Sequence, residues 1–272
     1  NPLQTTSFGT GEIIIDAINR GVRKFLIGLG GSATNDAAMG ILSALGYKFL
    51  DDNGIVLPPI GCSLNCVVDI NESEVDARLK ECSFTLLCDV SADFCGVNGD
   101  AYLFAPQKGA SYDDVLVLDA GLENFANILQ EKFGKDIKFE RFSGAAGGIG
   151  GTLFAVLNAQ LKHGIEEILD IVGFNKKVVG ADFVITGEGA MDKTSLLGKT
   201  PFGVCRRALA KGVKTIALAG RIDDAQILLD SGFYSVHSVV PNGMKLEEAM
   251  LPGIAKDNIK RTASEVFRLL SK

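Results

Sequence analysis

The sequence predicts an α/β protein made of two domains. Apolar runs of strand length alternate with amphipathic stretches of helix length, and glycine-rich turns follow several of the predicted strands. The chain has 272 residues, a length that allows one large domain or two of ordinary size. We place the boundary near residue 165, between an α/β domain over residues 1–165 that carries glycine-rich loops and a parallel-sheet domain over residues 166–272.

In the first half of the chain, helix and strand signals alternate. A first helix precedes an apolar strand, and the turn after that strand leads into a second helix. A later strand, residues 84–90, is apolar throughout and leads into a long polar loop through Gly109. The other expected elements are a helix over residues 12–20, a strand over 25–29, a turn over 30–36, a helix that ends near residue 45, and a strand over 47–50.

The rest of the chain continues the pattern, most regularly in its final third. Residues 113–133 have the 3.6-residue period of an amphipathic helix, and the glycine-rich residues 142–151 open a helix toward residue 161. Pro201 stands where a helix begins and Gly212 where it ends. The strand–helix repetition predicts a parallel sheet with helices on both faces. Its expected elements are strands over residues 181–186, 215–219 and 235–240, and helices over 202–211, 223–230 and 246–270.

Composition excludes several classes of protein. With a formal net charge of −6, the chain is too acidic for a domain that binds phosphate backbones, so nucleic acid is not an expected partner. The longest uncharged stretch, residues 142–161, contains glycines and polar side chains, and we expect no membrane span. The six cysteines lack a Cys-x-x-Cys pair, which disfavours a zinc cluster and predicts buried free thiols in a reducing cytoplasm.

The turn over residues 28–36 is the first candidate ligand site. The chain has 32 glycines, well above the usual share of roughly 7%, and several gather in turns of this kind. Here small residues let backbone N–H groups converge at the start of a helix, where an anion is attracted. A phosphate or carboxylate is therefore expected at the loop that contains Gly30, Gly31, Ser32, Thr34 and Asn35.

Two other interpretations of this turn remain open. Gly28, Gly30 and Ala33 match the dinucleotide pattern Gly-x-Gly-x-x-Ala. Asp51 follows them at about the sequence spacing of the acidic residue that binds the ribose in such proteins. On that interpretation the protein is a nicotinamide-dependent oxidoreductase. Alternatively, the last two residues of the turn merely cap the helix that follows.

A second candidate site follows the strand predicted over residues 181–186. The carboxyl end of a parallel strand is where α/β sheets bind ligands. The segment fails the Walker A spacing in both possible registers, so it is not a P-loop. Its charges form either a solvated loop or a site that a metal ion or phosphate organises. The candidate residues in this turn are Gly187, Glu188, Gly189, Asp192, Lys193, Ser195 and Lys199.

Two further segments carry weaker signals. Asp89 follows a buried strand and could hold a metal or act as a base, and Lys108 lies in a tight turn where it could pair with a phosphate or a substrate carboxylate. The run over residues 143–151 offers N–H donors at Gly147 and Gly148, or else permits close helix packing. Three anion-binding loops with lone carboxylates, and without a Ser–His pair or a metal-ligand histidine, favour phosphoryl transfer over hydrolysis or hydride chemistry.

Five short segments, residues 6–12, 27–36, 104–110, 144–148 and 184–189, span nearly the whole chain. Together and in this order they resemble the type I, or bacterial, glycerate kinase family. The resemblance implies an ATP- and Mg²⁺-dependent kinase that phosphorylates D-glycerate, typically at the 2-hydroxyl. It also implies two α/β domains, with the first inserted into a doubly wound, flavodoxin-like parallel-sheet domain and the active site in the cleft between them.

The sequence departs from the family pattern at two places. The family normally begins upstream with a strand and a Pro-Asp-Ser-Phe-Lys motif, whereas this chain opens on Asn1-Pro2 and suggests an interior start. Ala190 stands where the family usually has a basic residue after Gly-Glu-Gly. A noncatalytic anion-binding fragment therefore stays open as an alternative function.

The resemblance and the residue types together give each candidate a role. Asp192 is expected to act as the base or orienting carboxylate for the attacking hydroxyl, and Lys199 to neutralise the transferred phosphoryl group. Mg²⁺ would be held by Glu188 or Asp89. A cytoplasmic location follows from this reading, and a homodimer is compatible with it. The residues expected to bind ligands are Lys108, Asp89 and Ser195 for D-glycerate, and Gly30, Gly31, Ser32, Thr34, Asn35, Gly147, Gly148, Gly187 and Gly189 for ATP.

Overall fold

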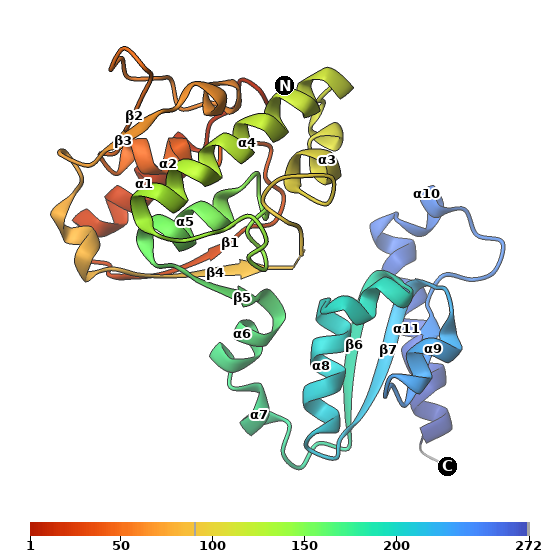
Figure 1. Ribbon diagram of the computed structural model, residues 1–272. Coiled ribbons are helices and arrows are strands. Elements are labelled where there is room, and N and C mark those ends of the chain that lie inside the picture. Colours follow the sequence, from red (N-terminus) through yellow and green to blue (C-terminus); the bar gives the residue numbers. More distant parts are fainter. Residues whose placement is uncertain (90, 271–272) are drawn as a thin grey trace. The chain divides into compact units, whose positions relative to one another are not determined.

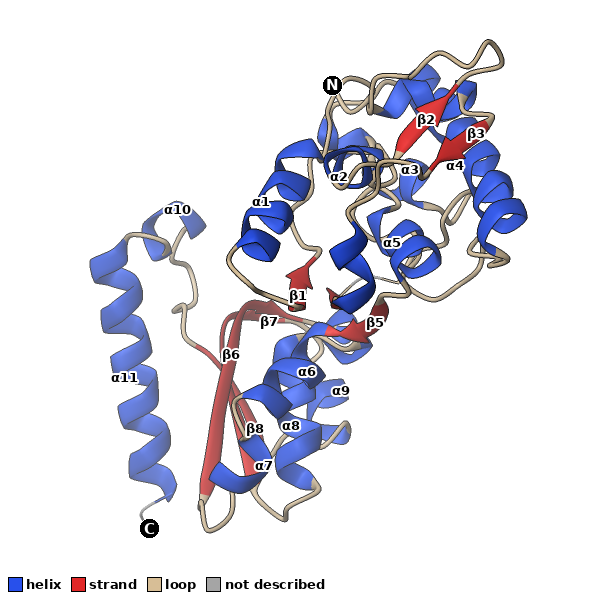
Figure 2. Ribbon diagram, turned by 90° about the vertical axis from the view of Figure 1, so that its left-hand side faces the viewer, coloured by secondary structure: helices blue, strands red, loops and turns tan. Residues whose placement is uncertain are grey.

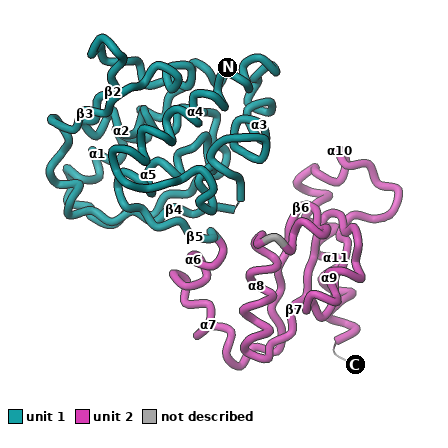
Figure 3. Tube along the Cα trace, viewed as in Figure 1, with its two compact units in different colours: residues 1–164 teal, residues 165–272 magenta. Residues whose placement is uncertain are grey.

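The computed structural model describes residues 1–89 and 91–270. The chain forms two compact units, Asn1–Gly164 and Ile165–Lys272, which Figure 3 shows in different colours. Both units combine helices with a parallel sheet, which confirms the predicted α/β class. Each helix within the described residues is too short or too polar to cross a lipid bilayer.

A three-stranded parallel sheet runs through unit 1 in the order β1-β4-β5. Its strands are β1 (Lys24–Gly28), β4 (Ser83–Cys88) and β5 (Gln160–His163). Gly28 lies opposite Leu87, and Cys88 lies opposite His163, so the carboxyl ends of the three strands meet along one edge. The strand predicted over residues 84–90 therefore ends at Cys88, and residue 90 lies outside the described residues.

The expected helix toward residue 161 is only partly correct. Helix α5 (Ile149–Leu157) stops at Asn158, which adopts a left-handed conformation with φ of 54°. The chain then enters the sheet as β5. An apolar run that crosses from helix to strand has no change of composition to mark the crossing, and the sequence prediction missed it.

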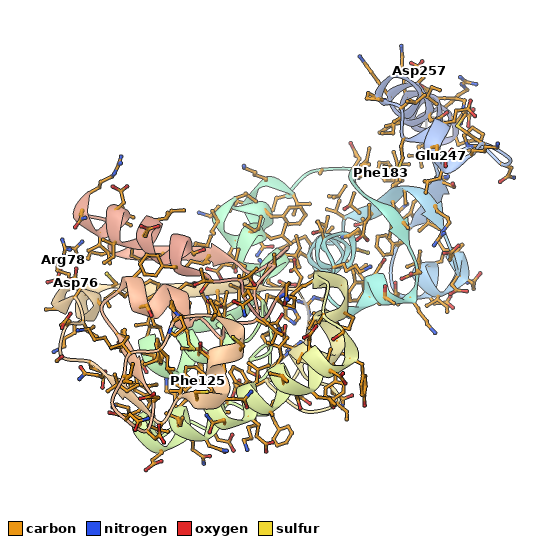
Figure 4. The ribbon with its side chains drawn as sticks, turned by 90° about the horizontal axis from the view of Figure 1, so that it is seen from above. Asp76, Arg78, Phe125, Phe183, Glu247 and Asp257 are labelled. Carbon is orange, nitrogen blue, oxygen red and sulfur yellow. The ribbon has the colours of Figure 1, made fainter. Side chains whose placement is uncertain are left out.

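Helices gather on one side of the unit 1 sheet, as Figures 1 and 2 show. Buried side chains of these helices and of the neighbouring strands form one core, in which the ring centroids of Phe49 and Phe125 lie 5.7 Å apart; Figure 4 labels Phe125. The longest helix begins with a capping box, because Ser111 Oγ accepts a hydrogen bond from Asp114 N, and Asp114 Oδ2 accepts one from Ser111 N. Besides α5, the α-helices are α1 (Phe8–Asn19), α2 (Met39–Ala44), α3 (Asp100–Phe104) and α4 (Tyr112–Phe133).

The strand expected over residues 47–50 is present as β2 (Lys48–Leu50), but it lies outside the parallel sheet. It pairs antiparallel with β3 (Asp69–Asn71), a strand that the sequence analysis missed. Three residues give too little alternation to identify a strand from its pattern. Short 3₁₀ helices complete the unit as η1 (Gly61–Cys66), η2 (Ala77–Glu81) and η3 (Pro106–Lys108).

Unit 2 contains a second parallel sheet, in the order β6-β7-β8. Helix α8 packs against β6 and β7, and α11 contacts β7 from the opposite face, as Figure 2 shows. Pro201 lies in the first turn of α8 as predicted. The elements are β6 (Phe183–Met191), η4 (Lys193–Leu197), α8 (Thr200–Leu209), β7 (Lys214–Ile222), α9 (Ala225–Asp230), β8 (Ser235–Ser238), α10 (Leu246–Ala249) and α11 (Pro252–Leu270), preceded by α6 (Gly164–Ile171) and α7 (Phe174–Lys177).

Two predictions for unit 2 are wrong. The single helix expected over residues 246–270 is divided into α10 and α11, because Pro252 cannot continue a helix but suits the first position of a new one. The turn expected from Gly187 onward begins later, because β6 continues through both glycines to Met191. Pairing of β6 with the long strand β7 over these residues overrides the weak strand preference of glycine.

Candidate active site

The turn over residues 28–36 follows β1, and its helix starts later than expected. Gly31 has φ of 72°, a conformation that favours glycine, and a Cβ added to Gly30 or Gly31 would meet no atom within 4 Å. Helix α2, however, begins only at Met39, behind Ala38 in a left-handed conformation. The predicted convergence of the turn's N–H groups on a helix start is therefore wrong in its geometry, although the loop itself is open.

An internal carboxylate occupies the start of α2. Asp36 Oδ2 accepts hydrogen bonds from Gly40 N at 3.1 Å, from Ser7 N at 2.6 Å and from Ser7 Oγ at 2.7 Å. Ser7 Oγ in turn accepts from Ile41 N. Burial raises the pKa of Asp36, and the hydrogen bonds from Ser7 oppose that rise. Asp36 thus joins the starts of α1 and α2. This contact agrees with the alternative prediction that the end of the turn caps the following helix.

The dinucleotide interpretation is contradicted by the topology. A Rossmann unit needs the strand after the glycine turn to lie parallel in the same sheet. Here β2 pairs with β3 in a separate antiparallel sheet. The carboxylate of Asp51 accepts hydrogen bonds from the backbone of Asn53 and Ile55, so it stabilises a local turn.

Several predicted site residues of unit 1 meet in one buried cluster. Lys108 Nζ donates a hydrogen bond to Thr34 O at 2.9 Å and lies 3.8 Å from Asp100 Oδ1. Asp100 Oδ1 also accepts from Gly147 N at 3.0 Å, and Asp100 Oδ2 accepts from Asn35 Nδ2. Three sequence segments that the resemblance had joined only by analogy, around residues 34, 108 and 147, are therefore in physical contact.

Burial shifts the pKa values of the two charged groups in this cluster. The Lys108 side chain is 7% exposed and that of Asp100 is fully buried. Burial raises the pKa of Asp100 to about 6, while the Lys108 ammonium opposes the rise. Burial also lowers the pKa of Lys108, and Asp100 counteracts it. Each charge therefore depends on the other.

The glycines near residue 147 serve close packing. Gly147 has φ of 75°, and a Cβ there would clash with Thr34 O. A Cβ on Gly148 would lie 3.0 Å from the ring of Phe94. Both glycines are buried, so the packing interpretation accounts for them without a ligand, and their contact with ATP stays a prediction.

Asp89 lies directly after β4, and it is exposed. A Cβ on Gly164 would lie 2.7 Å from Asp89 Oδ1, so a side chain at residue 164 would require the Asp89 carboxylate to move. Asp89 lies at the carboxyl edge of the unit 1 sheet, where parallel sheets bind ligands, and its role toward a substrate or a cation stays a prediction.

The unit 2 candidates form a second cluster at the carboxyl end of β6. Ser195 Oγ donates a hydrogen bond to Glu188 Oε2 at 3.4 Å, and Lys199 Nζ lies 3.9 Å from Glu188 Oε1. The side chains of Glu188 and Lys199 are 30% and 41% exposed, so an anion or a cation can reach both charges. An acid, a hydroxyl and a lysine side by side can hold a metal ion and neutralise a phosphoryl group.

Asp192 caps the short helix η4. Its Oδ1 accepts hydrogen bonds from Thr194 N at 2.7 Å and Thr194 Oγ1 at 2.6 Å, while Asp192 N donates to Ser195 Oγ. The Thr194 hydrogen bonds hold the pKa of Asp192 below its usual value. A carboxylate with a lowered pKa is a weak base, so this geometry suits the orienting role better than proton abstraction.

A pocket of about 1070 Å³ opens between the unit 2 sheet and helices α10 and α11. Gly187, Glu188 and Gly189 line it from β6, whereas Asp192, Ser195 and Lys199 are not among its lining residues. Its remaining wall is largely apolar. The predicted residues of unit 2 are thus divided between this pocket and the η4 turn beside it.

Within the described residues, there is no group of three or more His, Cys, Asp or Glu side chains that could hold a metal ion. Mg²⁺ does not require such a group, because proteins commonly hold it by one or two carboxylates together with water and phosphates. Glu188, beside Ser195 and with its side chain 30% exposed, is one carboxylate that a cation could reach.

Sequence reasoning missed Asp100. It follows Asn98-Gly99 at the start of α3, where an acidic residue is common because it favours the helix dipole. The only sequence signal was an acid in the loop between two candidate segments. That its side chain points into the core, toward Asn35 and Gly147, depends on contacts between distant residues.

The fold and the two clusters define an α/β protein with acid, hydroxyl and lysine groups at the carboxyl ends of parallel strands. A family model described as the glycerate kinase family matches residues 1–271. A glycerate kinase of Bacillus cereus is 39% identical over 98% of this chain and 70% of its own length. A glycerate 2-kinase of Escherichia coli is 39% identical over 100% of this chain and 71% of its own.

A solved structure agrees with these sequence matches. The crystal structure of a glycerate kinase 2 candidate from Salmonella typhimurium superposes with a TM-score of 0.83 at 36% identity, covering 100% of this chain and 70% of that chain. This chain belongs to the glycerate kinase family.

Proposed function

We propose that this protein transfers the γ-phosphoryl group of ATP to a hydroxyl of D-glycerate. The observation that carries the proposal is membership of the glycerate kinase family over residues 1–271. The proposed acceptor is the 2-hydroxyl, because the Escherichia coli relative, aligned over this whole chain, is named a glycerate 2-kinase. The expected product is 2-phosphoglycerate.

The residues of unit 2 are proposed to serve the phosphoryl group. The Lys199 ammonium neutralises negative charge on the transferred phosphoryl oxygens, and Asp192 orients the attacking hydroxyl by accepting its hydrogen bond. Glu188 would hold Mg²⁺ together with the ATP phosphates, and the bound ion would supply further charge neutralisation. Phosphoryl transfer passes through a loose transition state, so positioning and charge neutralisation provide most of the acceleration.

The residues of unit 1 are proposed to bind the organic acid. A lysine ammonium has three N–H donors, and Lys108 uses one on Thr34 O and directs another at Asp100. The third can pair with the carboxylate of glycerate. Asp89, exposed after β4, is proposed to accept a hydrogen bond from a glycerate hydroxyl or to act as a second metal carboxylate.

The six cysteines are free, which supports the proposal of a cytoplasmic enzyme, because structural thiols persist as thiols in a reducing compartment. Only Cys88 and Cys205 are buried and Cys66 is exposed, so the expectation that all six are buried was too broad.

A coupled assay for ADP release with D-glycerate tests the function. Phosphorus NMR of the product separates the 2-phosphate from the 3-phosphate. Release of ADP that depends on D-glycerate supports the kinase, whereas binding of glycerate without ADP release would support a noncatalytic anion-binding protein. An absorbance change with NAD and glycerate would support an oxidoreductase.

A further inference from the structure

Asp100 connects three segments of unit 1 from a fully buried position. It is the first residue of α3, and its two carboxylate oxygens face inward. Oδ1 accepts the Gly147 N–H and lies near the Lys108 ammonium, and Oδ2 accepts from the Asn35 amide. Asp100 therefore contacts the turn after β1, the turn at η3 and the glycine run before α5.

A carboxylate suits all these contacts, because both of its oxygens accept hydrogen bonds. An ionised carboxylate is an acceptor at both oxygens, whereas an amide of the same shape has one acceptor and one donor group. If an amide replaced Asp100, either Gly147 N or Asn35 Nδ2 would face another donor inside the protein. The ammonium of Lys108 would also lose the charge of Asp100, and the more indirect influence of Asp36 would remain.

Two observations indicate that the cluster serves a ligand as well as the fold. The buried Asn35 Oδ1 has no hydrogen-bond partner among the described residues, and buried polar atoms are rarely left unpaired. Lys108, in addition, keeps an N–H donor beyond those directed at Thr34 and Asp100. Asp100 therefore fixes two side chains, Asn35 and Lys108, and each of them keeps one hydrogen-bonding group without a partner in the part of the chain that the structure describes.

We infer that Asp100 is a positioning residue for glycerate binding, which acts by fixing Lys108, Asn35 and the backbone of Gly147. The inference rests on the proposed function, since Lys108 is the proposed ligand of the glycerate carboxylate. Asp100 itself is fully buried and does not touch the substrate. Its carboxylate sets where the Lys108 ammonium points and holds the Asn35 carbonyl oxygen in place.

The test compares Asp100→Asn with Asp119→Asn in the full chain. Asp119 is a matched control, because its carboxylate also accepts a loop N–H, from Gly96 at 2.7 Å, and burial also raises its pKa, but it contacts no proposed site residue. Asp100→Asn is expected to raise the KM for D-glycerate about tenfold or more, with kcat little changed. Asp119→Asn is expected to keep both values.

A double-mutant cycle shows whether Asp100 acts through Lys108. Lys108→Met alone is expected to raise the KM for glycerate strongly, and adding Asp100→Asn should raise it little further, because the positioned group is already gone. If the KM for glycerate in the double variant rose by the product of the two single-variant increases, the inference would be overturned. A KM for glycerate in Asp100→Asn within about twofold of the wild type would also overturn it.

Hydrogen exchange separates failure of this inference from failure of the proposed function. In Asp100→Asn the amides of Gly147 and Ala37, which donates to Gly147 O, should exchange faster while the rest of unit 1 stays protected. Unchanged exchange at both amides, or faster exchange throughout unit 1, would contradict the positioning role whether or not the wild type phosphorylates glycerate. If the wild-type chain has no kinase activity and Asp100→Asn still shows this local change in exchange, the proposed function alone would be overturned.

Discussion

Gly147 lies directly against the carbonyl oxygen of Thr34, so closely that a Cβ on Gly147 would collide with it and would lie 2.9 Å from the Cα of Asn35. This contact joins the glycine run before α5 to the turn after β1. Ala37 N donates to Gly147 O at 2.9 Å and fixes the same approach. Two segments about 110 residues apart in sequence thus share one backbone junction beside Lys108 and Asp100.

Gly147→Ala should destabilise the protein by about 3 kcal/mol or more, because it combines a left-handed conformation with a backbone collision. Gly134→Ala is the matched control: Gly134 has φ of 70°, but a Cβ there would meet nothing within 4 Å. The control should cost only about 1 to 2 kcal/mol from its conformation. Urea unfolding measures both. Equal losses would show that the contact with Thr34 contributes nothing.

Asp192→Asn should lower kcat at least roughly 100-fold, because the amide cannot orient the attacking hydroxyl as a carboxylate does. The fold should be retained, because an asparagine is also a good cap residue. Asp76→Asn provides the control. Asp76 caps the 3₁₀ helix η2 in the same way, by accepting from Arg78 N, and Figure 4 labels the pair in unit 1. Near-normal kcat in Asp192→Asn would remove Asp192 from the mechanism.

Lys199→Met should lower kcat more than it raises the KM for ATP, since the ammonium is proposed to meet charge that develops in the transition state. The Lys199 side chain is partly exposed beside Glu188, so its loss should leave stability nearly unchanged. The control is Lys211→Met, which removes an exposed lysine after α8 that has no proposed role, and it should retain full activity. Steady-state kinetics of both variants measure these effects. A rise in the KM for ATP with unchanged kcat would assign Lys199 to ground-state binding instead.

Stability should fall with rising pH in a way that Asp100 explains. The pKa of Asp100 is raised by burial from 3.8 to about 6, so the folded protein binds this proton more tightly than the unfolded chain. The stabilisation is therefore fully present below about pH 4 and is lost as the pH rises through about 6.

Asp100→Asn cannot titrate, so comparison with the wild type isolates this effect. As the pH rises from 4 to 7, the unfolding free energy of the wild type should fall by roughly 2 to 3 kcal/mol relative to that of Asp100→Asn. Urea unfolding at several pH values measures the shift. A difference that stays constant across this range would show that Asp100 titrates as it does in the unfolded chain.

Sequence signals were reliable where local chemistry decides the structure. Pro201 marks the start of α8, and the period of residues 113–133 predicts α4 to within one residue at its start. They failed where partners distant in sequence decide. The glycines at 187 and 189 indicated a turn but lie in β6, because β7 pairs with that segment. Two other misses have local causes: β3 has only three residues and so too little alternation, and the apolar run of α5 continues into β5 without a change of composition.

The candidate site shows the same division. The segments around Thr34, Lys108 and Gly147 could be selected from residue types, and the structure brings them together. Asp100, which holds them, carried no distinctive signal. The unit 2 residues Glu188, Ser195 and Lys199 could be grouped from their spacing, because a strand end and a short helical turn keep residues close in sequence close in space.

The central claim is that this chain is a kinase for D-glycerate, and the most direct measurement is the rate of ADP release from Mg-ATP with and without D-glycerate, with the phosphorylated product identified by phosphorus NMR. We predict glycerate-dependent ADP release with formation of 2-phosphoglycerate, at a rate that drops in Asp192→Asn and persists in Asp76→Asn. Equal ADP release with and without glycerate, and no phosphoglycerate in the product, would contradict the claim.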